Sequence, residues 1–166
     1  MTGGEQGFER FYRASYQPLV RVLIPVVLDV HAAEEVAQEA FLRAYKDWPK
    51  VSGYEDPRGW LYRVAMRLAI SRWRRLRTAS AALTRYGAPA DVDSTDEVSL
   101  SVLAALRKLP LPQRQALVMH HMLGIPVAEI AAELGVPIGT MKARLSRGRS
   151  ALAPLLADLD EVVGRG

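Results

Sequence analysis

Arginine and aromatic side chains share one stretch of this sequence, residues 57–77, PRGWLYRVAMRLAISRWRRLR. Eight arginines and no acidic residue lie between Pro57 and Ala90, so the positive charge is not balanced locally. Arginines neutralise phosphates, and the flat rings of Trp and Tyr stack on bases that have left a duplex. This combination of residue types indicates contact with a nucleic acid whose bases are unstacked.

Helical periodicity predicts how the residues of this stretch divide between two faces. Asp56 can cap the first turn, and Pro57 suits the first helical position. At about 100° per residue one stripe is apolar and is expected to face a core; it consists of Leu61, Val64, Ala65, Leu68 and Leu76. The opposite face is expected to expose Arg63, Met66, Arg67, Ile70, Arg74 and Arg77, flanked by Trp60, Tyr62 and Trp73.

Other interpretations of this helix stay open. Trp60 and Trp73 are equally well explained as core anchors, because tryptophan is usually mostly buried. Basic amphipathic helices also bind membrane surfaces or calmodulin-like grooves. The arginines alone therefore do not decide between these partners.

A second group of base-binding side chains follows Pro137. Pro126 opens the helical pattern VAEIAAEL, Gly135 allows a tight turn, and a second helical pattern runs from Pro137 to Leu156. Two short helices joined by a Gly-centred turn predict a helix-turn-helix, whose second helix enters the major groove. Its outward and flanking positions carry side chains that can bond base edges or phosphates: Thr140, Lys142, Ala143, Arg144, Ser146, Arg147 and Arg149. Basic residues also complement a helix dipole, but three Arg and one Lys within residues 142–149 favour groove binding.

Catalytic chemistry finds little support. The sequence contains no cysteine, which excludes disulfides, thiolate catalysis and cysteine-ligated zinc. His120 and His121 are adjacent and point in different directions from one helix, and His31 is isolated. We expect no enzyme activity, no metal site and no cofactor.

The two groups belong to different parts of an all-helical chain. Helical spacing begins at Phe8, although Pro18 and Pro25 are expected to break or kink the first helix. Together with the helices expected at 32–48 and 57–77, this first helix predicts one domain over residues 5–77. Residues 78–98 are small, polar and finally acidic, which is typical of a flexible linker. Residues 99–157 form the second domain, so the predicted fold is all-α: two small helical domains joined by a flexible acidic linker, the C-terminal one a helix-turn-helix.

The helix predicted over Ala32–Trp48 buries an alanine-rich stripe and presents a polar face with Leu42 in its middle. A leucine ringed by polar groups can anchor a partner protein. Single exposed leucines are also common and need no explanation. Leu42 alone therefore does not establish a docking face.

Charge and hydropathy limit where the protein can act. The net charge is +4, and its basic excess is concentrated in residues 51–90. The most apolar run, Leu19–Val30, contains Arg21, Pro25 and Asp29, so membrane insertion is not expected. The N-terminus lacks the basic and apolar regions of a signal peptide. We expect a soluble cytoplasmic protein.

Three motifs, in this order, resemble one known family. They are AEEVAQEAFLRAYKDW at 33–48, RGWLYRVA at 58–65 and LPLPQRQALVMHHMLGIPVAEIAAELGVPIGTMKARLSRGRSAL at 109–152. Together they resemble the extracytoplasmic-function group of bacterial RNA polymerase sigma factors, the minimal kind with two domains. The resemblance covers about residues 8–77 and 99–156.

The resemblance implies binding to core RNA polymerase, recognition of the minus 35 and minus 10 promoter elements, and strand opening for transcription initiation. Docking on the clamp coiled coil of the largest polymerase subunit would use Glu35, Gln38, Glu39, Leu42 and Arg43. Contact with the minus 10 element would use Tyr54, Trp60, Tyr62, Arg63, Arg67, Ile70 and Arg74. Contact with the minus 35 element would use Thr140, Lys142, Ala143, Arg144, Ser146 and Arg147. The acidic linker would thread into the polymerase, and an anti-sigma factor is a further partner that the resemblance leaves open.

The chain departs from the family pattern at three positions. Arg67 stands where members often have Asn, Ser71 where they often have Asp, and Ala143 where Ser is frequent. An arginine cannot offer the paired donor and acceptor of an amide. The base preference at the minus 10 element is therefore expected to differ from that of such members.

Two other classes of protein compete with the sigma factor hypothesis. A stand-alone helix-turn-helix transcription regulator would bind duplex DNA unaided, but it leaves the arginine and aromatic face without a task. A membrane-surface or scaffold protein would bind anionic vesicles even after Lys142→Ala and Arg147→Ala.

Overall fold

The structure, a computed structural model, describes residues 3–78 and 97–163. The chain divides into two compact units, Met1–Pro89 and Ala90–Gly166, and each is described by itself. Every regular element within the described residues is a helix, as predicted. The first unit contains α1 (Gly3–Val27), α2 (Val30–Lys46), α3 (Trp48–Val51) and α4 (Pro57–Thr78).

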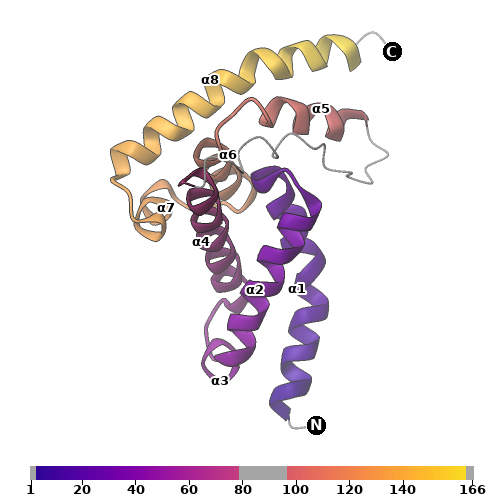
Figure 1. The fold of residues 1–166 in the computed structure, drawn as a ribbon, viewed down its shortest axis with the longest axis vertical. Coiled ribbons are helices and arrows are strands. Elements are labelled where there is room, and N and C mark those ends of the chain that lie inside the picture. The colour runs from indigo at the N-terminus through magenta and orange to yellow at the C-terminus, as the bar shows by residue number, and fades with distance from the viewer. Residues whose placement is uncertain (1–2, 79–96, 164–166) are drawn as a thin grey trace. The chain divides into compact units, whose positions relative to one another are not determined.

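In the first unit, α2 packs between α1 and α4, and successive long helices run in opposite directions (Figure 1). Alanines recur along the inner stripe of α2, where their small side chains let both neighbours approach closely: Ala33, Ala37, Ala40 and Ala44. Leu19, Leu23 and Val26 of α1 fill the space against them and are fully buried. An aromatic cluster covers the other end, where Phe8 meets Trp48 edge-on with ring centroids 5.4 Å apart.

Two aspartates cap helices of this unit. Asp29 accepts hydrogen bonds from the backbone N–H groups of His31 and Ala32, at 2.8 and 3.2 Å. Asp56 accepts one from Gly59 N at 2.9 Å, which confirms its predicted capping role at the start of α4. These carboxylates satisfy N–H groups that have no partner within the helix.

Helix α1 runs without interruption through Pro18 and Pro25, so neither proline breaks it as expected. A proline removes the hydrogen bond to the carbonyl four residues earlier. Those carbonyls belong to Ala14 and Arg21, both of which are exposed. Water can therefore replace the lost bonds, and the buried face of α1 holds the helix together.

The second unit contains α5 (Glu97–Leu106), α6 (Leu111–Leu117), a π-helical turn η2 (Val118–Met122), α7 (Val127–Leu134) and α8 (Ile138–Val163). Helix α8 packs against α5, α6 and α7. Met119, Ile130, Met141 and Leu145 form the centre of its core. Gly135 ends α7 with φ +66°, a left-handed conformation that glycine adopts without strain. The predicted helix-turn-helix is confirmed.

Gly148 lets α8 approach α6 closely. A Cβ added there would lie 2.9 Å from Cδ1 of Leu117, a buried side chain of α6. The absence of a side chain at position 148 thus sets the spacing between the two helices.

The linker predicted over residues 78–98, with its acidic side chains, lies almost wholly in residues 79–96, outside the described part of the chain. Among the described residues, no helix combines the length and apolar character that crossing a membrane requires.

Candidate nucleic-acid interface

Helix α4 buries a wider sector than the sequence predicted. The expected inner positions Leu61, Val64, Ala65 and Leu68 are buried. Met66 and Ile70 are buried too, with 0% and 6% of their surfaces exposed, so their predicted place on the exposed face is wrong. The reason is that α4 contacts both α2 and α1, and two neighbours cover more of a helix than one. Ile70 is therefore not part of the exposed arginine face.

Aromatic rings and arginines lie in pairs around α4. Tyr54 and Trp60 have ring centroids 6.1 Å apart. The Arg77 guanidinium lies over the Trp73 ring, 4.9 Å from its centroid, and Arg58 Nε donates to the Tyr62 hydroxyl at 3.0 Å. Trp60 and Trp73 are both half-buried, so each ring packs on the helix and also reaches solvent.

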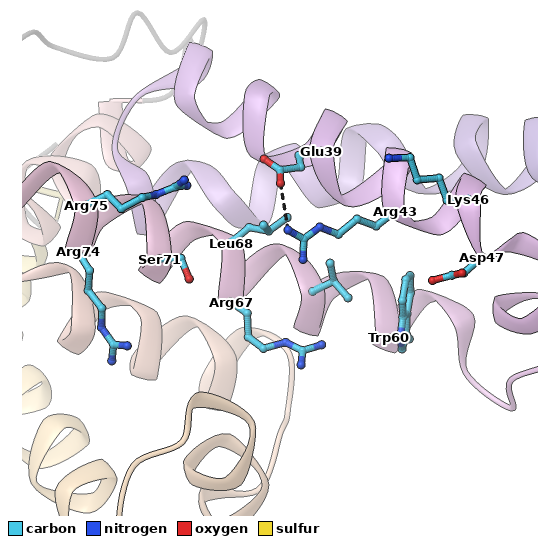
Figure 2. A pocket seen from close by; sticks show the side chains of 11 residues that line it. Glu39, Arg43, Lys46, Asp47, Trp60, Arg67, Leu68, Ser71, Arg74 and Arg75 are labelled. Carbon is cyan, nitrogen blue, oxygen red and sulfur yellow. Dashed lines mark hydrogen bonds and ion pairs between the residues drawn. The ribbon is translucent and has the colours of Figure 1, made fainter.

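A groove of about 790 Å³ lies between α2 and α4 (Figure 2). Val64 and Leu68 give it an apolar floor and Trp60 an aromatic wall. The other residues that line it are polar or charged: Glu39, Arg43, Lys46, Asp47, Arg67, Ser71, Arg74 and Arg75. Five cations and two carboxylates make it positive, and it combines the features that bind a nucleotide: charge for phosphate and a flat ring for a base.

The groove unites residues that the sequence assigned to different partners. Trp60, Arg67 and Arg74 come from the predicted minus 10 set, and Glu39 and Arg43 come from the predicted polymerase set. Figure 2 shows Arg67 and Arg74 extending from the same side of α4, while Arg43 reaches Glu39 across one turn of α2. The Arg43 Nη2 to Glu39 Oε1 distance is 3.1 Å.

Some groove residues were missed, and some predicted residues lie elsewhere. Lys46, Asp47, Ser71 and Arg75 line the groove, although none of them was predicted to be a site residue. The signal was present: positions 60, 64, 67, 71 and 74 form one stripe of α4 at helical spacing. Tyr54, Tyr62 and Arg63 are half-buried and do not line the groove.

The outer face of α2 presents the remaining predicted polymerase residues. Glu35, Gln38 and Leu42 are exposed as predicted. Glu35 forms an ion pair with Arg72 of α4, and its Oε2 lies 2.5 Å from Nη1 of that arginine. Leu42 is 52% exposed, and Tyr45, one turn further on, is equally exposed. Leu42 and Tyr45 together make an apolar patch that the sequence predicted only in part.

Gln38 also reaches α1. Its side chain bonds the Tyr16 hydroxyl, and this bond lowers the pKa of Tyr16. Burial has the larger effect, so the pKa of Tyr16 is raised above its ordinary value. Tyr16 therefore stays protonated at physiological pH and can act as a hydrogen-bond donor.

Helix α8 exposes most of the residues predicted to contact the minus 35 element. Thr140, Lys142, Ser146 and Arg147 are exposed, whereas Ala143 and Arg144 are half-buried. Buried Met141 and Leu145 alternate with the exposed positions and fix the helix on the core. The exposed side chains are therefore presented by a supported helix.

Two family models match the chain: Sigma-70 region 2 over residues 11–79 and Sigma-70, region 4 over residues 99–152. The sigma factor SigW of Bacillus subtilis is 33% identical over 147 residues, which cover 79% of each chain. The sigma factor SigC of Mycobacterium tuberculosis is 31% identical over 164 residues, covering 95% of this chain and 86% of SigC.

A solved structure shares the fold. The sigma factor RpoE from Bartonella quintana, determined in complex with the anti-sigma factor NepR, aligns with a TM-score of 0.69. The alignment covers 92% of this chain and 98% of RpoE, at 24% sequence identity. The helical fold of this chain is thus found in a solved sigma factor.

Proposed function

Because the chain belongs to the extracytoplasmic-function group of sigma-70 RNA polymerase sigma factors, we propose a division of its surfaces among polymerase, single-stranded DNA and duplex DNA. As a member of this family it binds RNA polymerase and promoter elements in transcription initiation. It is not an enzyme: it gives promoter specificity to one. Each of these three contacts uses a different set of residues.

The groove between α2 and α4 takes the unpaired strand of the minus 10 element. The observation that carries this assignment is the meeting of Trp60, Arg67 and Arg74 over an apolar floor. Trp60 stacks on a base that has left the duplex, and the arginines bind the phosphates on either side. Tyr54 extends the aromatic surface beside Trp60, while Tyr62 and Arg63 contact DNA outside the groove.

The outer face of α2 docks on the clamp coiled coil of the largest polymerase subunit. Leu42 supports this assignment because it is half-exposed and lies among Glu35, Gln38 and Glu39. An apolar anchor within a polar ring is the common arrangement of binding hot spots. Tyr45 enlarges the anchor on the same face.

Helix α8 binds the minus 35 element in the major groove. Exposed Lys142, Ser146 and Arg147 offer donors to base edges and phosphates, and Thr140 begins the contact near the start of the helix. Ala143 and Arg144 lie at the border of the packed face, so a smaller part of each side chain can contact DNA. A bidentate contact from Arg147 to a guanine would contribute about 1–3 kcal/mol of discrimination.

The proposed domains are residues 5–77 and 99–157, joined by a linker over residues 78–98 that enters the polymerase. The chain acts in the cytoplasm, where polymerase and promoter are found. An anti-sigma factor is a further partner, since the RpoE of Bartonella quintana was determined with one.

Co-elution with bacterial core RNA polymerase on a sizing column tests the docking face. Leu42→Glu places a charge at the apolar anchor and is expected to abolish co-elution. Gln17→Glu is the matched control: it adds the same charge at an exposed position of α1 and should leave co-elution intact. Co-elution that survives Leu42→Glu would place the docking face elsewhere on the chain.

A further inference from the structure

The turn η2 and helix α8 meet at a histidine and arginine that the proposed function does not use. Arg149 Nε donates to His121 Nε2 at 3.2 Å, across 28 positions of sequence. Both side chains are exposed, so this contact is not part of the core. Exposed polar contacts add little to stability, so the pair is better explained by what it can bind.

Arg149 lies just beyond the reading face of α8. Bases are contacted by the N-terminal turns of a recognition helix, and a straight helix leaves a curved groove after a few turns. Arg149 is eleven residues past the helix start at Ile138, which is about 16 Å at 1.5 Å per residue. We therefore expect a side chain at that distance to reach the phosphates that border the groove rather than the base edges.

The geometry leaves the pair able to bind an anion. Arg149 donates its Nε–H to His121, so the N–H groups of both Nη nitrogens can donate to an anion. His121 accepts this bond through Nε2, so its ring is neutral in this arrangement. The adjacent His120 is held separately, because its Nδ1 donates to the Ile125 carbonyl at 2.9 Å. Protonation of His121 would turn Nε2 from an acceptor into a second donor beside Arg149.

The free protein disfavours that protonation. Partial desolvation of its exposed ring lowers the pKa of His121, and the positive charge of Arg149 on α8 and the neighbouring His120 lower it further. A phosphate placed against Arg149 reverses the balance, because its negative charge favours the imidazolium.

We propose that His121 and Arg149 form a phosphate-binding pair that grips the DNA backbone beside the minus 35 element, and that His121 takes up a proton when DNA binds. The inference rests on the proposed placement of α8 in the major groove. When His121 is protonated, it releases Arg149 Nε, and both side chains donate to the same phosphate. Because the bound pKa then exceeds the free one, affinity for duplex DNA is gained as pH falls through the bound pKa and is lost as pH rises through it.

Two measurements on the full chain test the pair, with a mixed-sequence duplex of about 20 base pairs at low salt as the probe. Histidine NMR titration is expected to show that the duplex raises the pKa of His121 by about one, which corresponds to about tenfold in affinity. Fluorescence anisotropy should show the matching rise in affinity between about pH 8 and pH 5.5. His121→Gln should remove that rise, and Arg149→Ala should reduce the salt slope by about one.

His31→Gln is the matched control, since it removes an exposed histidine of the other unit and should leave the rise unchanged. Inorganic phosphate lacks the other contacts of the duplex, so it should raise the pKa of His121 only at concentrations far above that of the duplex. An equal rise at an equal phosphate concentration would overturn the assignment to the DNA backbone. If Arg147→Ala weakens duplex binding but His121→Gln leaves the pH dependence intact, this inference alone is wrong. Failure to bind the duplex at any pH, both alone and in complex with core RNA polymerase, overturns both the inference and the proposed role of α8.

Discussion

The two surfaces of this sigma factor that we propose to bind DNA are built in different ways. The face of α8 lies on one helix, and exposed Lys142, Ser146 and Arg147 follow one another within six residues. The groove of the first unit needs two helices, because Arg43 and Lys46 come from α2 while Trp60 and Arg67 come from α4. A surface on one helix depends on that helix being held in place, whereas a surface between helices depends on how they pack against each other.

A substitution in the core of the first unit should distinguish the two surfaces most strongly, because it weakens the groove and leaves α8 unchanged. Met66→Ala leaves a cavity under α4 and is expected to lower the free energy of unfolding by about 2–5 kcal/mol. Urea denaturation of the full chain measures it, and binding of a single-stranded oligonucleotide should weaken with it. Duplex binding through α8 should not change, because Met66 lies outside that unit.

Leu42→Ala is the control for this prediction, because Leu42 is an apolar side chain of the same unit that is half-exposed. It should change the free energy of unfolding by less than about 0.5 kcal/mol. If the Met66→Ala and Leu42→Ala variants had the same free energy of unfolding, Met66 would be exposed, as the helical periodicity predicted.

The next effect should come from the aromatic wall of the groove. Trp60→Ala removes a ring on which a base can stack, and we expect a loss of about 1–3 kcal/mol in binding a single-stranded oligonucleotide. Fluorescence anisotropy with a labelled strand measures the loss. Trp73→Ala is the control, since Trp73 is covered by Arg77 and lies outside the groove. Equal losses for the two variants would contradict the assignment of the strand to this groove.

The smallest expected effect is that of Arg43→Ala, which tests whether Arg43 contacts the DNA strand or the polymerase. Arg43→Ala removes one cation from the groove, so the salt slope of single-strand binding should fall by about 0.7. Arg13→Ala is closely matched, because Arg13 pairs with Glu9 four residues earlier just as Arg43 pairs with Glu39. Co-elution with core polymerase should be unaffected by either change. Loss of co-elution with Arg43→Ala would return Arg43 to the polymerase-docking face.

Local features of the sequence predicted local features of the fold. The cap at Asp56 and the turn at Gly135 each depend on residues within a few positions, and each is confirmed. The uninterrupted α1 was not predicted, because the effect of Pro18 and Pro25 depends on whether water reaches the carbonyls they leave without a partner. The all-helical class followed from periodicity alone.

The groove was not predicted, because a single helix pattern does not say which neighbours will cover it. Periodicity placed Met66 and Ile70 opposite the core, but α4 packs on both α1 and α2, and the buried sector widened to include them. Lys46 and Arg75 were missed for the same reason: each lies at a plausible helical position, but only the pairing of α2 with α4 brings them to one groove. Pairing between helices is set by the whole unit.

Gly148 separates two kinds of change along α8. Exposed and packed positions interleave on this helix, so Lys142, Ser146 and Arg147 can be exchanged without disturbing Met141 and Leu145. A single methyl group at position 148 would instead press on the buried side chain of Leu117, which would have to move. Copies of this gene could therefore diverge in promoter preference through a few outward codons while one glycine codon stays fixed, which is how one scaffold can serve many separate regulons.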